Sequence, residues 1–365
     1  MAKRGAAENP KSRFERIEVE PEPEEAAALA AGIAQLDTRL LDDPSRSILA
    51  TNQSPDVGFD VSINPYRGCE HACAYCYARP THEYLGFSAG LDFESRILVK
   101  RRAPALLRKA LASPRWQPQV IAISGVTDAY QPAERKLEIT RGCLQVLAEF
   151  RNPVAIVTKN RLVTRDADLL GELAAVQAAA VNLSITSLDP QLQQRMEPRA
   201  SAPQQRLAAI QELARAGVPV GVMVAPIIPG LNDHEVPRIL QAAADAGARS
   251  AAHIVLRLPH GVKDLFSAWQ SRHYPERRDK VLNRVREVRG GRLNDTRFGS
   301  RMRGQGIYVE QVRALFHSAA RRAGLDGAPP ALSSAARTAS GTSAMRGLYR
   351  GRGDRSVVMS HPLFP

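Results

Sequence analysis

A cluster of cysteines constrains this chain more than any other feature of its sequence. Cys69, Cys73 and Cys76 lie within eight residues in a C-x3-C-x2-C pattern, and the 365-residue chain has four cysteines in all. We interpret the segment as a loop that wraps three thiols around a bound group. Thiolates at this density bind soft metals, and three ligands leave one coordination position open. The rest of the chain is therefore expected to support a metal centre.

Charge and cysteine content limit the classes of protein to which the chain can belong. The formal net charge is +13, mostly from arginine, which favours polyanions such as nucleic acid as partners. A GC-rich coding sequence that raises Arg and Ala together would explain the same surplus, so both explanations stay open. The clustered cysteines indicate a metal site in a reducing compartment rather than a set of disulfides. Because no apolar signal segment or membrane-spanning run is present, a cytoplasmic protein without membrane contact is expected.

Beyond residue 50 the chain alternates between strand-like and helix-like segments. Runs rich in β-branched residues predict strands, most of them followed by a segment long enough for a crossover helix. The predicted strands cover residues 60–63, 120–124, 154–158, 180–186, 218–224 and 252–258. The predicted helices cover residues 102–111, 132–150, 203–216 and 233–246, with another that begins at Asp166, and Gly217 and Gly247 are expected helix C-caps. These units predict an α/β fold, a partial (β/α)6 TIM-like barrel with disordered N- and C-terminal extensions.

Four regions are predicted along the chain. Residues 1–50 are charged and rich in Pro and Ala, so we expect an arm that is either mostly disordered or draped over the domain, with one helix near residues 26–41. Residues 51–261 are expected to form the partial barrel. Residues 262–325 are expected to be a basic helical extension, and residues 326–365, rich in Arg, Gly, Ser and Ala, a disordered tail.

A three-cysteine loop on a partial barrel resembles the radical S-adenosylmethionine (SAM) superfamily. The hallmark of that family, C-x3-C-x-aromatic-C, matches Cys69, Cys73, Tyr75 and Cys76. The resemblance implies a radical SAM core over residues 51–261, in which three thiolates hold three irons of a [4Fe–4S] cluster and SAM chelates the fourth. It implies reductive cleavage of SAM to a 5′-deoxyadenosyl radical that abstracts hydrogen from a substrate. It also implies an electron donor, such as flavodoxin or ferredoxin, and a contact between Tyr75 and adenine.

The resemblance assigns a SAM contact to the turn after the second strand. This turn contains Ser124, Gly125, Thr127 and Asp128, and in the family it binds the methionine amino group. An ordinary β/α turn, with Asp128 as a local hydrogen-bonding residue, is the alternative.

Three further residues resemble SAM contacts of the family. Lys159, just after the third strand, and Ser184, on the fourth, match carboxylate and ribose contacts. The carboxyl ends of the strands, where ligands bind in such folds, are a sensible place for them. A solvated lysine and a core-lining serine are the alternatives. Arg199 is expected either to clamp a carboxylate with two hydrogen bonds or to pair with Glu197 on the surface.

A structural zinc site with His71 as fourth ligand is the competing interpretation of the cysteine loop. His71 lies two residues from both Cys69 and Cys73, which matches the ligand spacing of zinc fingers poorly. The β/α context also disfavours a zinc module.

Longer motifs resemble the group of spore photoproduct lyase and DNA repair photolyase-like proteins. These motifs span residues 64–69, 76–79, 127–132 and 226–233. The lyases split a thymine-dimer lesion after hydrogen abstraction and use a cysteine after the second strand as hydrogen donor. This chain has no cysteine near Gly125, and Cys143 is expected to be a buried structural thiol inside a helix. Tyr77, beside the third cysteine, is the candidate catalytic residue for relaying a hydrogen atom, and the lyase reaction itself stays open.

A basic segment follows the predicted barrel. Residues 272–303 hold eleven Arg or Lys and four Asp or Glu, and Trp269, Tyr274 and Phe298 flank or interrupt them. This composition suits a nucleic-acid groove with stacking side chains, and a solvated basic helix is the alternative. Three functions stay open: a radical SAM enzyme acting on a nucleic-acid base, one modifying a protein or small molecule, and a non-catalytic iron–sulfur protein.

Overall fold

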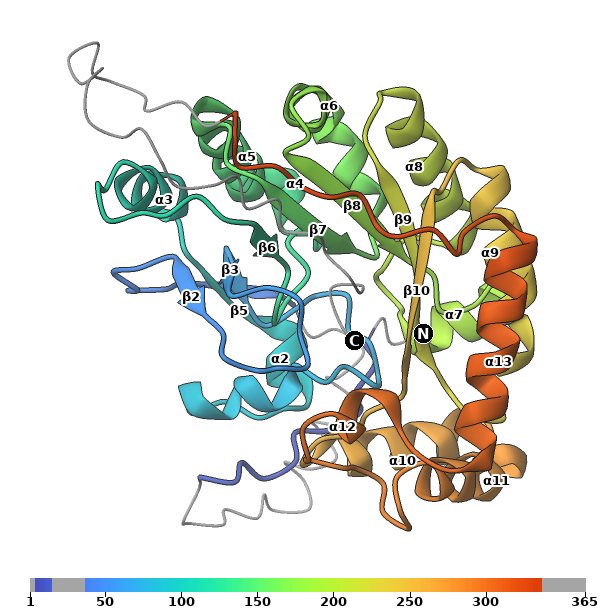
Figure 1. Ribbon diagram of the computed structural model, residues 1–365. Helices are drawn as coiled ribbons and strands as arrows, with labels where there is room; N and C mark the ends of the chain where they lie inside the picture. The colour runs from blue at the N-terminus through green and yellow to red at the C-terminus, as the bar shows by residue number, and fades with distance from the viewer. Residues whose placement is uncertain (1–3, 15–36, 337–365) are drawn as a thin grey trace, which may run out of the picture.

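The fold is built on one open sheet of seven strands. The computed structural model describes residues 4–14 and 37–336. Six strands run parallel in chain order, β3-β6-β7-β8-β9-β10, and β2 pairs antiparallel at the edge beside β3 (Figure 1). Their bounds are β2 Leu49–Thr51, β3 Val61–Ile63, β6 Ile121–Ile123, β7 Val154–Thr158, β8 Ala179–Ser184, β9 Val220–Ile227 and β10 Ser250–Val255. In this described chain β3 and β10 are not paired with each other, so the sheet stays open.

The six parallel strands confirm the predicted α/β class. Each of them overlaps its predicted range. All residues of β3, β6 and β9 are buried, because both faces of these strands are covered, and parallel strands in that position read as nearly continuous apolar runs. Six parallel strands in chain order are consistent with a partial barrel.

Helices cover the outer face of the sheet (Figure 1). Those between and after the strands are α3 Ala103–Leu111, α4 Glu134–Leu137, α5 Ile139–Phe150, α6 Ala167–Ala175, α7 Pro190–Met196, α8 Pro203–Arg215, α9 Val236–Asp245 and α13 Ile307–Arg322. Fully buried apolar side chains from this layer, such as Leu147, Leu213 and Leu240, pack with sheet residues such as Ile156 into the main core. The last helix, α13, packs on α9 and extends the same layer.

The helix predicted over residues 132–150 is interrupted at Glu138, which separates α4 from α5 and has a φ of 50°. The cause is the buried Glu134. Its carboxylate accepts hydrogen bonds from the backbone N–H groups of Thr140 (3.0 Å) and Arg141 (3.3 Å). These donors belong to the first turn of α5 and have no partner within the helix. A side chain from the preceding short helix therefore caps the longer one.

Two helices end at the predicted glycines. Gly217 follows α8 with a φ of 77°, and Gly247 follows α9 with a φ of 102°. A left-handed residue after a helix lets the chain turn back toward the next strand, and glycine adopts that conformation without strain.

Residues 4–14 of the N-terminal region agree with the second of the two expected forms of this arm, the one draped over the domain. Residues 4–14 lie against the domain, where the backbone N–H groups of Gly5 (3.0 Å) and Ala6 (2.8 Å) donate to the buried carboxylate of Glu94. A buried carboxylate needs such donors, which is why a stretch without regular structure is held in place.

A second, small sheet also involves the N-terminal region. β1 (Arg39–Asp42) pairs with β5 (Arg96–Val99), which in turn pairs with β4 (Tyr66–Arg67), next to the cysteine loop. β1 occupies the end of the helix predicted near residues 26–41, so that part of the prediction is wrong. Residues 15–36 lie outside the described residues.

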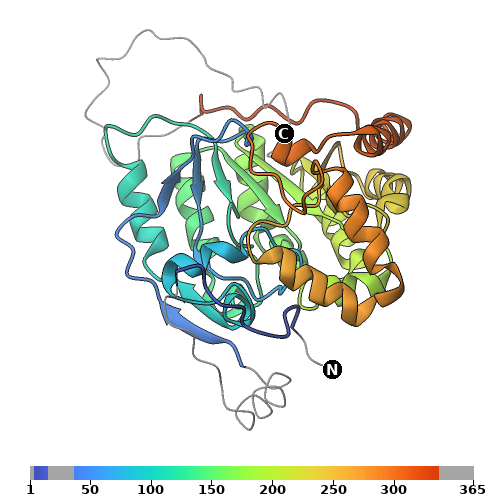
Figure 2. The ribbon, with the colours of Figure 1, turned by 90° about the horizontal axis from the view of Figure 1, so that it is seen from below.

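The chain after β10 packs at both ends of the sheet. Helices α10 (Val262–His273), α11 (Pro275–Glu287) and α12 (Ser300–Arg303) gather at the carboxyl end of β10 (Figures 1 and 2). After α13 the chain returns across the amino ends, where the N–H of Ser333 donates to the carbonyl of Gln177 (2.9 Å). Residues 337–365 of the predicted tail lie outside the described residues. No helix in the described ranges is long and apolar enough to cross a membrane.

Substitution of Gly217 by alanine tests the backbone explanation of the helix end. Gly217→Ala is expected to lower the free energy of unfolding by about 1 kcal/mol, because alanine must adopt a positive φ although the added Cβ meets no atom. Gly261→Ala is the control, since Gly261 has a φ of −66° and equally open surroundings, and it is expected to be neutral or slightly stabilising. Urea denaturation followed by circular dichroism measures both, and equal losses would contradict the explanation.

Candidate functional site

One pocket lies at the carboxyl ends of the parallel strands, where the cysteine loop crosses the sheet. It brings together residues from the loop, from the ends of five strands and from α12. They are Cys69, His71, Cys73, Tyr75, Cys76, Tyr77, Ala78, Ser124, Val126, Thr127, Asp128, Val157, Thr158, Lys159, Ser184, Met223, Ala225, Pro226, Ile254, Val255, Leu256, Arg257 and Met302. The sequence predicted most of the polar members, and the structure brings them to one place.

The three loop cysteines are free thiols that line this pocket together. Cys69 and Cys73 are buried, and Cys76 is partly buried. Burial raises the pKa of Cys73 well above its usual value and raises that of Cys76 to about 11. Thiolates are therefore unfavourable here unless a positive group compensates them, which fits a bound metal cluster.

The geometry disfavours the zinc alternative. The Nδ1 atom of His71 faces the Asp128 carboxylate at 3.3 Å, and its Nε2 atom lies 3.0 Å from the side-chain nitrogen of Asn160. Both ring nitrogens of His71 are thus engaged by protein groups. Among the described residues, no three His, Cys, Asp or Glu side chains are arranged to hold one metal ion. A [4Fe–4S] cluster differs, because each thiolate binds a different iron and the thiols surround a larger object.

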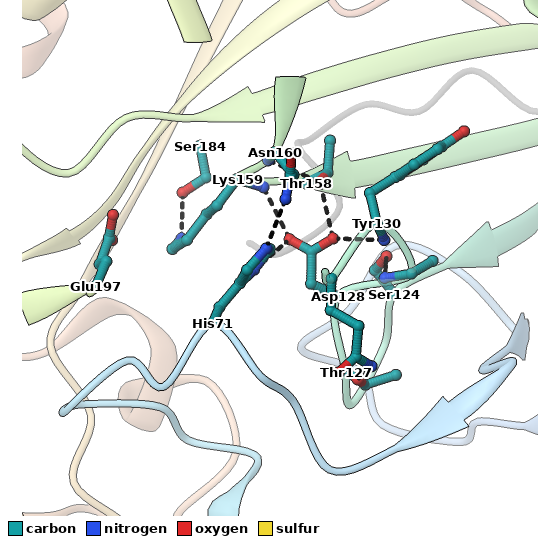
Figure 3. A network of polar contacts seen from close by, with 12 residues as sticks. His71, Ser124, Thr127, Asp128, Tyr130, Thr158, Lys159, Asn160, Ser184 and Glu197 are labelled. Atoms are coloured by element: carbon teal, nitrogen blue, oxygen red, sulfur yellow. Dashed lines mark hydrogen bonds and ion pairs between the residues drawn. The ribbon is translucent and has the colours of Figure 1, made fainter. Parts of the chain in front are cut away.

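The carboxylate of Asp128 is the hub of the polar network beside the cysteines (Figure 3). One oxygen accepts hydrogen bonds from the Thr158 hydroxyl (2.8 Å) and the Tyr130 N–H (2.9 Å), and the other accepts from the Lys159 N–H (2.8 Å) and faces His71. Burial acts to raise the pKa of this carboxyl, but the contact with His71 and the backbone donors outweighs burial and holds the pKa below its usual range. Asp128 thus stays ionised and joins β6, β7 and the cysteine loop.

The turn that begins with Ser124 is also bonded to the cysteine loop. Ser124 has a φ of 82°, unusual for a residue other than glycine, and its hydroxyl accepts a hydrogen bond from the Ala129 N–H (3.0 Å). The Tyr77 hydroxyl donates to the carbonyl of Gly125 (2.7 Å), and the Thr127 hydroxyl donates to the carbonyl of Gly68 (2.6 Å). The carbonyl and hydroxyl groups of this turn are thus partly used to fix the loop.

Lys159 and Ser184 lie together on the same wall of the pocket. The Lys159 ammonium group donates to the Ser184 hydroxyl (2.6 Å) and lies 3.3 Å from the carbonyl of Ala225. It also lies 6.0 Å from the centre of the Tyr75 ring. This position disagrees with the alternative of a solvated surface lysine, because the ammonium group points into the pocket (Figure 3).

Comparisons with known proteins agree with this arrangement. Residues 63–243 match the radical SAM superfamily. An uncharacterized protein of Mycobacterium tuberculosis (strain ATCC 25618 / H37Rv) is 37% identical over 244 residues, which cover 66% of this chain and 71% of that protein. The chain belongs to the radical SAM superfamily. Members of this superfamily use SAM and a [4Fe–4S] cluster, and the three thiols around one pocket fit that cofactor pair.

Solved structures of spore photoproduct lyase share the fold of this radical SAM protein. One variant with dinucleoside spore photoproduct has a TM-score of 0.57 at 16% identity, with 86% of each chain covered. Another variant has a TM-score of 0.55 at 19% identity, with 86% of this chain and 85% of that chain covered. The resemblance predicted from the motifs is thus confirmed at the level of superfamily and fold.

A second buried carboxylate, that of Glu197, holds a residue of the pocket wall in place. The sequence did not indicate that Glu197 is buried. Glu197 accepts hydrogen bonds from the hydroxyls of Tyr75 and Thr186 and pairs with the buried Arg206 of α8. Burial acts to raise the pKa of Glu197, but Arg206 and Lys159 outweigh it and lower the pKa to about 2. The Tyr75 hydroxyl is therefore anchored, which leaves its ring to line the pocket.

Arg199 does not line the pocket, and its predicted contact to a SAM carboxylate finds no support in the geometry. Its guanidinium group donates to the Thr38 hydroxyl (3.1 Å) and to the Glu70 carboxylate (2.8 Å), on the outer side of the cysteine loop. The alternative pairing with Glu197 is wrong, because Glu197 is buried and taken by Arg206.

The remaining predicted residues divide between the core and the surface. Cys143 is fully buried in α5, which confirms it as a structural thiol. Trp269 is also fully buried, with its indole N–H donating to the Arg195 carbonyl (2.9 Å), so the prediction that it stacks on bases is wrong. Tyr274 is half-buried against Arg195, whereas Phe298 has 62% of its surface exposed.

Sequence reasoning missed three polar residues that hold or line the site: Asn160, Arg206 and Arg257. Two of them could have been found from the sequence alone. Asn160 follows Lys159 directly, and Arg257 lies two residues after β10, both at the carboxyl ends of strands where ligands bind in such sheets. Nothing local marks Arg206, whose importance comes from the buried Glu197.

Removal of the charge on Glu197 tests this support. Glu197→Gln is expected to lower the free energy of unfolding by about 3 kcal/mol, because Arg206 would keep a buried charge without its partner. Glu212→Gln on α8, the helix that carries Arg206, is the control, since Glu212 and Arg161 are both about half exposed, and a loss under about 1 kcal/mol is expected. Guanidinium denaturation of both variants gives the comparison, and a small loss for Glu197→Gln would remove its assigned role.

Proposed function

We propose that this protein is an enzyme that reductively cleaves SAM and uses the resulting radical to abstract hydrogen from a nucleic-acid base. The observation that carries the proposal is the shared pocket, in which three free thiols face the polar ends of the parallel strands. A non-catalytic iron–sulfur protein would need the thiols but not this lined space beside them.

Cys69, Cys73 and Cys76 would hold the cluster, and the residues beside them would hold SAM. When bound, a reduced [4Fe–4S] cluster and SAM supply a 5′-deoxyadenosyl radical. Lys159, with its ammonium group in the pocket, would pair with the carboxylate of SAM, and the Tyr75 ring would lie against adenine.

The polar residues on the facing walls complete the proposed SAM site. Ser184 would contact the ribose, and the turn of Ser124, Gly125, Thr127 and Asp128 would receive the amino group. Asp128 already has four polar contacts, so it would orient this turn. Its carboxylate would also supply negative charge near the positively charged amino group of SAM.

Three features support a nucleic-acid substrate. The chain carries a net charge of +13, and its basic segment includes α11 and α12, the second of which lines the pocket through Met302. Phe298, in the loop before α12, is exposed and has the guanidinium group of Arg301 over its ring at 4.3 Å, which suits stacking on a base. A structural neighbour with the same fold is described with dinucleoside spore photoproduct.

Tyr77 is proposed as the residue that returns a hydrogen atom. All four cysteines are described, and the three in the pocket are the proposed cluster ligands, whereas Cys143 is buried in α5. A thiol donor of the lyase type is therefore not available in this pocket. The Tyr77 ring lines the pocket, 40% of its surface is exposed, and its hydroxyl bonds to the carbonyl of Gly125.

The decisive test is the fate of deuterium. Reconstituted, chemically reduced protein is expected to form 5′-deoxyadenosine from SAM, and mass spectrometry is expected to find deuterium in it when nucleic acid from cells grown in deuterated medium is added. The protein fraction of the same cells serves as the comparison and is expected to transfer none. Transfer from the protein fraction alone would favour modification of a protein, and no cleavage of SAM at all would leave only a non-catalytic iron–sulfur protein.

Two cysteine substitutions test the cluster assignment. Cys73→Ala is expected to prevent full iron loading and to abolish SAM cleavage, because one iron would lose its thiolate. Cys143→Ala is the matched control, since Cys143 lies in α5 away from the pocket, and it is expected to keep both properties. Iron content and the visible spectrum report the loading. A fully loaded, active Cys73→Ala protein would contradict the assignment.

A further inference from the structure

Arg257 brings a positive charge into the pocket at the end of β10. It follows the strand by two residues and lines the pocket together with Val255 and Leu256. Its guanidinium carbon lies 5.8 Å from the centre of the Tyr77 ring, and one of its terminal nitrogens lies 2.8 Å from the sulfur of Met302. Arg257 therefore faces the same space as the residue proposed to relay hydrogen.

This guanidinium group has no anionic partner among the described residues. The described ion pairs include none to Arg257, and its buried Nε atom has no hydrogen-bond partner. A thioether sulfur is a weak acceptor, so Met302 does not replace a carboxylate. Burial lowers the pKa of Arg257, and nearby Arg301 lowers it further. A charged group held in this way is unfavourable unless a ligand supplies the missing negative charge.

Asp56 is the acidic group that acts to raise the pKa of Arg257, but its carboxylate is engaged by other groups. Asp56 gives one carboxylate oxygen to the Arg301 guanidinium group and the other to the backbone N–H of Gly299 (2.7 Å). Asp56 and Arg301 thus satisfy each other and fix the loop that carries α12. Arg257, in contrast to Arg301, lines the pocket without a carboxylate partner among the described residues.

Lys159 and Arg257 line different parts of the pocket. The Lys159 ammonium group lies at the Ser184 hydroxyl and 6.0 Å from the Tyr75 ring, among the residues proposed to hold SAM. The Arg257 guanidinium group lies 5.8 Å from the Tyr77 ring instead. Since the proposed function assigns the carboxylate of SAM to Lys159, Arg257 stays available for an anion of the substrate.

We propose that Arg257 binds a backbone phosphate of a single-stranded nucleic-acid substrate and so positions the neighbouring base beside Tyr77. This inference rests on the proposed function and names the contact that selects its substrate. A guanidinium group matches a phosphate with two parallel hydrogen bonds, and its Nε, unsatisfied in the described chain, is one of the donors such a contact uses. The exposed ring of Phe298, in the loop before α12, offers an aromatic surface on which a base can stack, which favours nucleic acid over an acidic peptide.

Binding of a short, fluorescently labelled single-stranded DNA to the cluster-loaded full chain tests the proposal by anisotropy. Arg257→Gln is expected to weaken binding at least tenfold, and Arg257→Lys to recover part of the loss. The same DNA with uncharged methylphosphonate linkages is expected to bind wild type and Arg257→Gln alike, since the contact is to the phosphate charge. Arg249→Gln is the control, because Arg249 is exposed at the opposite end of the same strand, and less than a twofold change is expected.

The outcomes separate this inference from the proposed function. Equal binding of the charged DNA by wild type and Arg257→Gln, or equal losses for charged and uncharged DNA, would overturn the role of Arg257. Weaker binding of S-adenosylhomocysteine by Arg257→Gln, with unchanged DNA binding, would reassign the residue to SAM. Tighter binding of an acidic peptide than of DNA would assign the site to a carboxylate. Failure of wild type to cleave SAM would overturn the proposed function alone, because the binding comparison does not depend on cleavage.

Discussion

The contact between Asp128 and His71 holds the cysteine loop in one position relative to the sheet. Asp128 lies in the turn after β6, and its remaining hydrogen bonds come from Thr158 and Lys159 at the end of β7. His71 lies between the first two cysteines and is held on its other side by Asn160. The loop also packs Cys73, Ala74 and Tyr75 into an apolar cluster, and the polar contacts add a fixed position relative to β6 and β7.

Two further carboxylates fix the loop in the same way on other sides. Glu197 receives the Tyr75 hydroxyl and ties that part of the loop to β8 and α8 through Thr186 and Arg206. Glu70 accepts the N–H of Ala133 and pairs with Arg199. Each carboxylate is buried and fully engaged, and removing a partner from such a group costs more than the net stabilisation of the pair. The loop is thus pre-organised by groups that never need to touch a ligand.

Periodicity and composition were sufficient to predict the frame of this molecule. The six parallel strands, the glycine helix ends and the buried Cys143 depend on local patterns of apolar residues, and all of them are found. The interruption at Glu138 could not be predicted, because it depends on Glu134 capping the next helix. The N-terminal segment likewise depends on a carboxylate, Glu94, that lies far away in the sequence.

The same distinction explains which site residues were predictable. Lys159 and Ser184 could be predicted because they stand at the ends of strands, where the fold itself assembles ligands. The predictions for Arg199 and Trp269 were wrong because their partners come from distant segments of the chain. Arg199 pairs with Glu70, and the buried Trp269 donates its indole N–H to the Arg195 carbonyl. An arginine-rich sequence therefore says little about which arginines are free.

Burial and pairing decide that question for the basic residues of this chain. Arg206 and Arg301 each have a carboxylate, and Arg289 donates to the carbonyls of Val255 and Leu256, so their charges serve the fold. These carbonyls precede Arg257 directly, and Arg289 fixes the backbone from which the Arg257 side chain enters the pocket. Arg257 thus combines a fixed backbone, a partly buried guanidinium group and no ion pair within the described chain. An arginine in that situation is available to bind an anionic ligand, whereas Arg206 and Arg301 stabilise the fold.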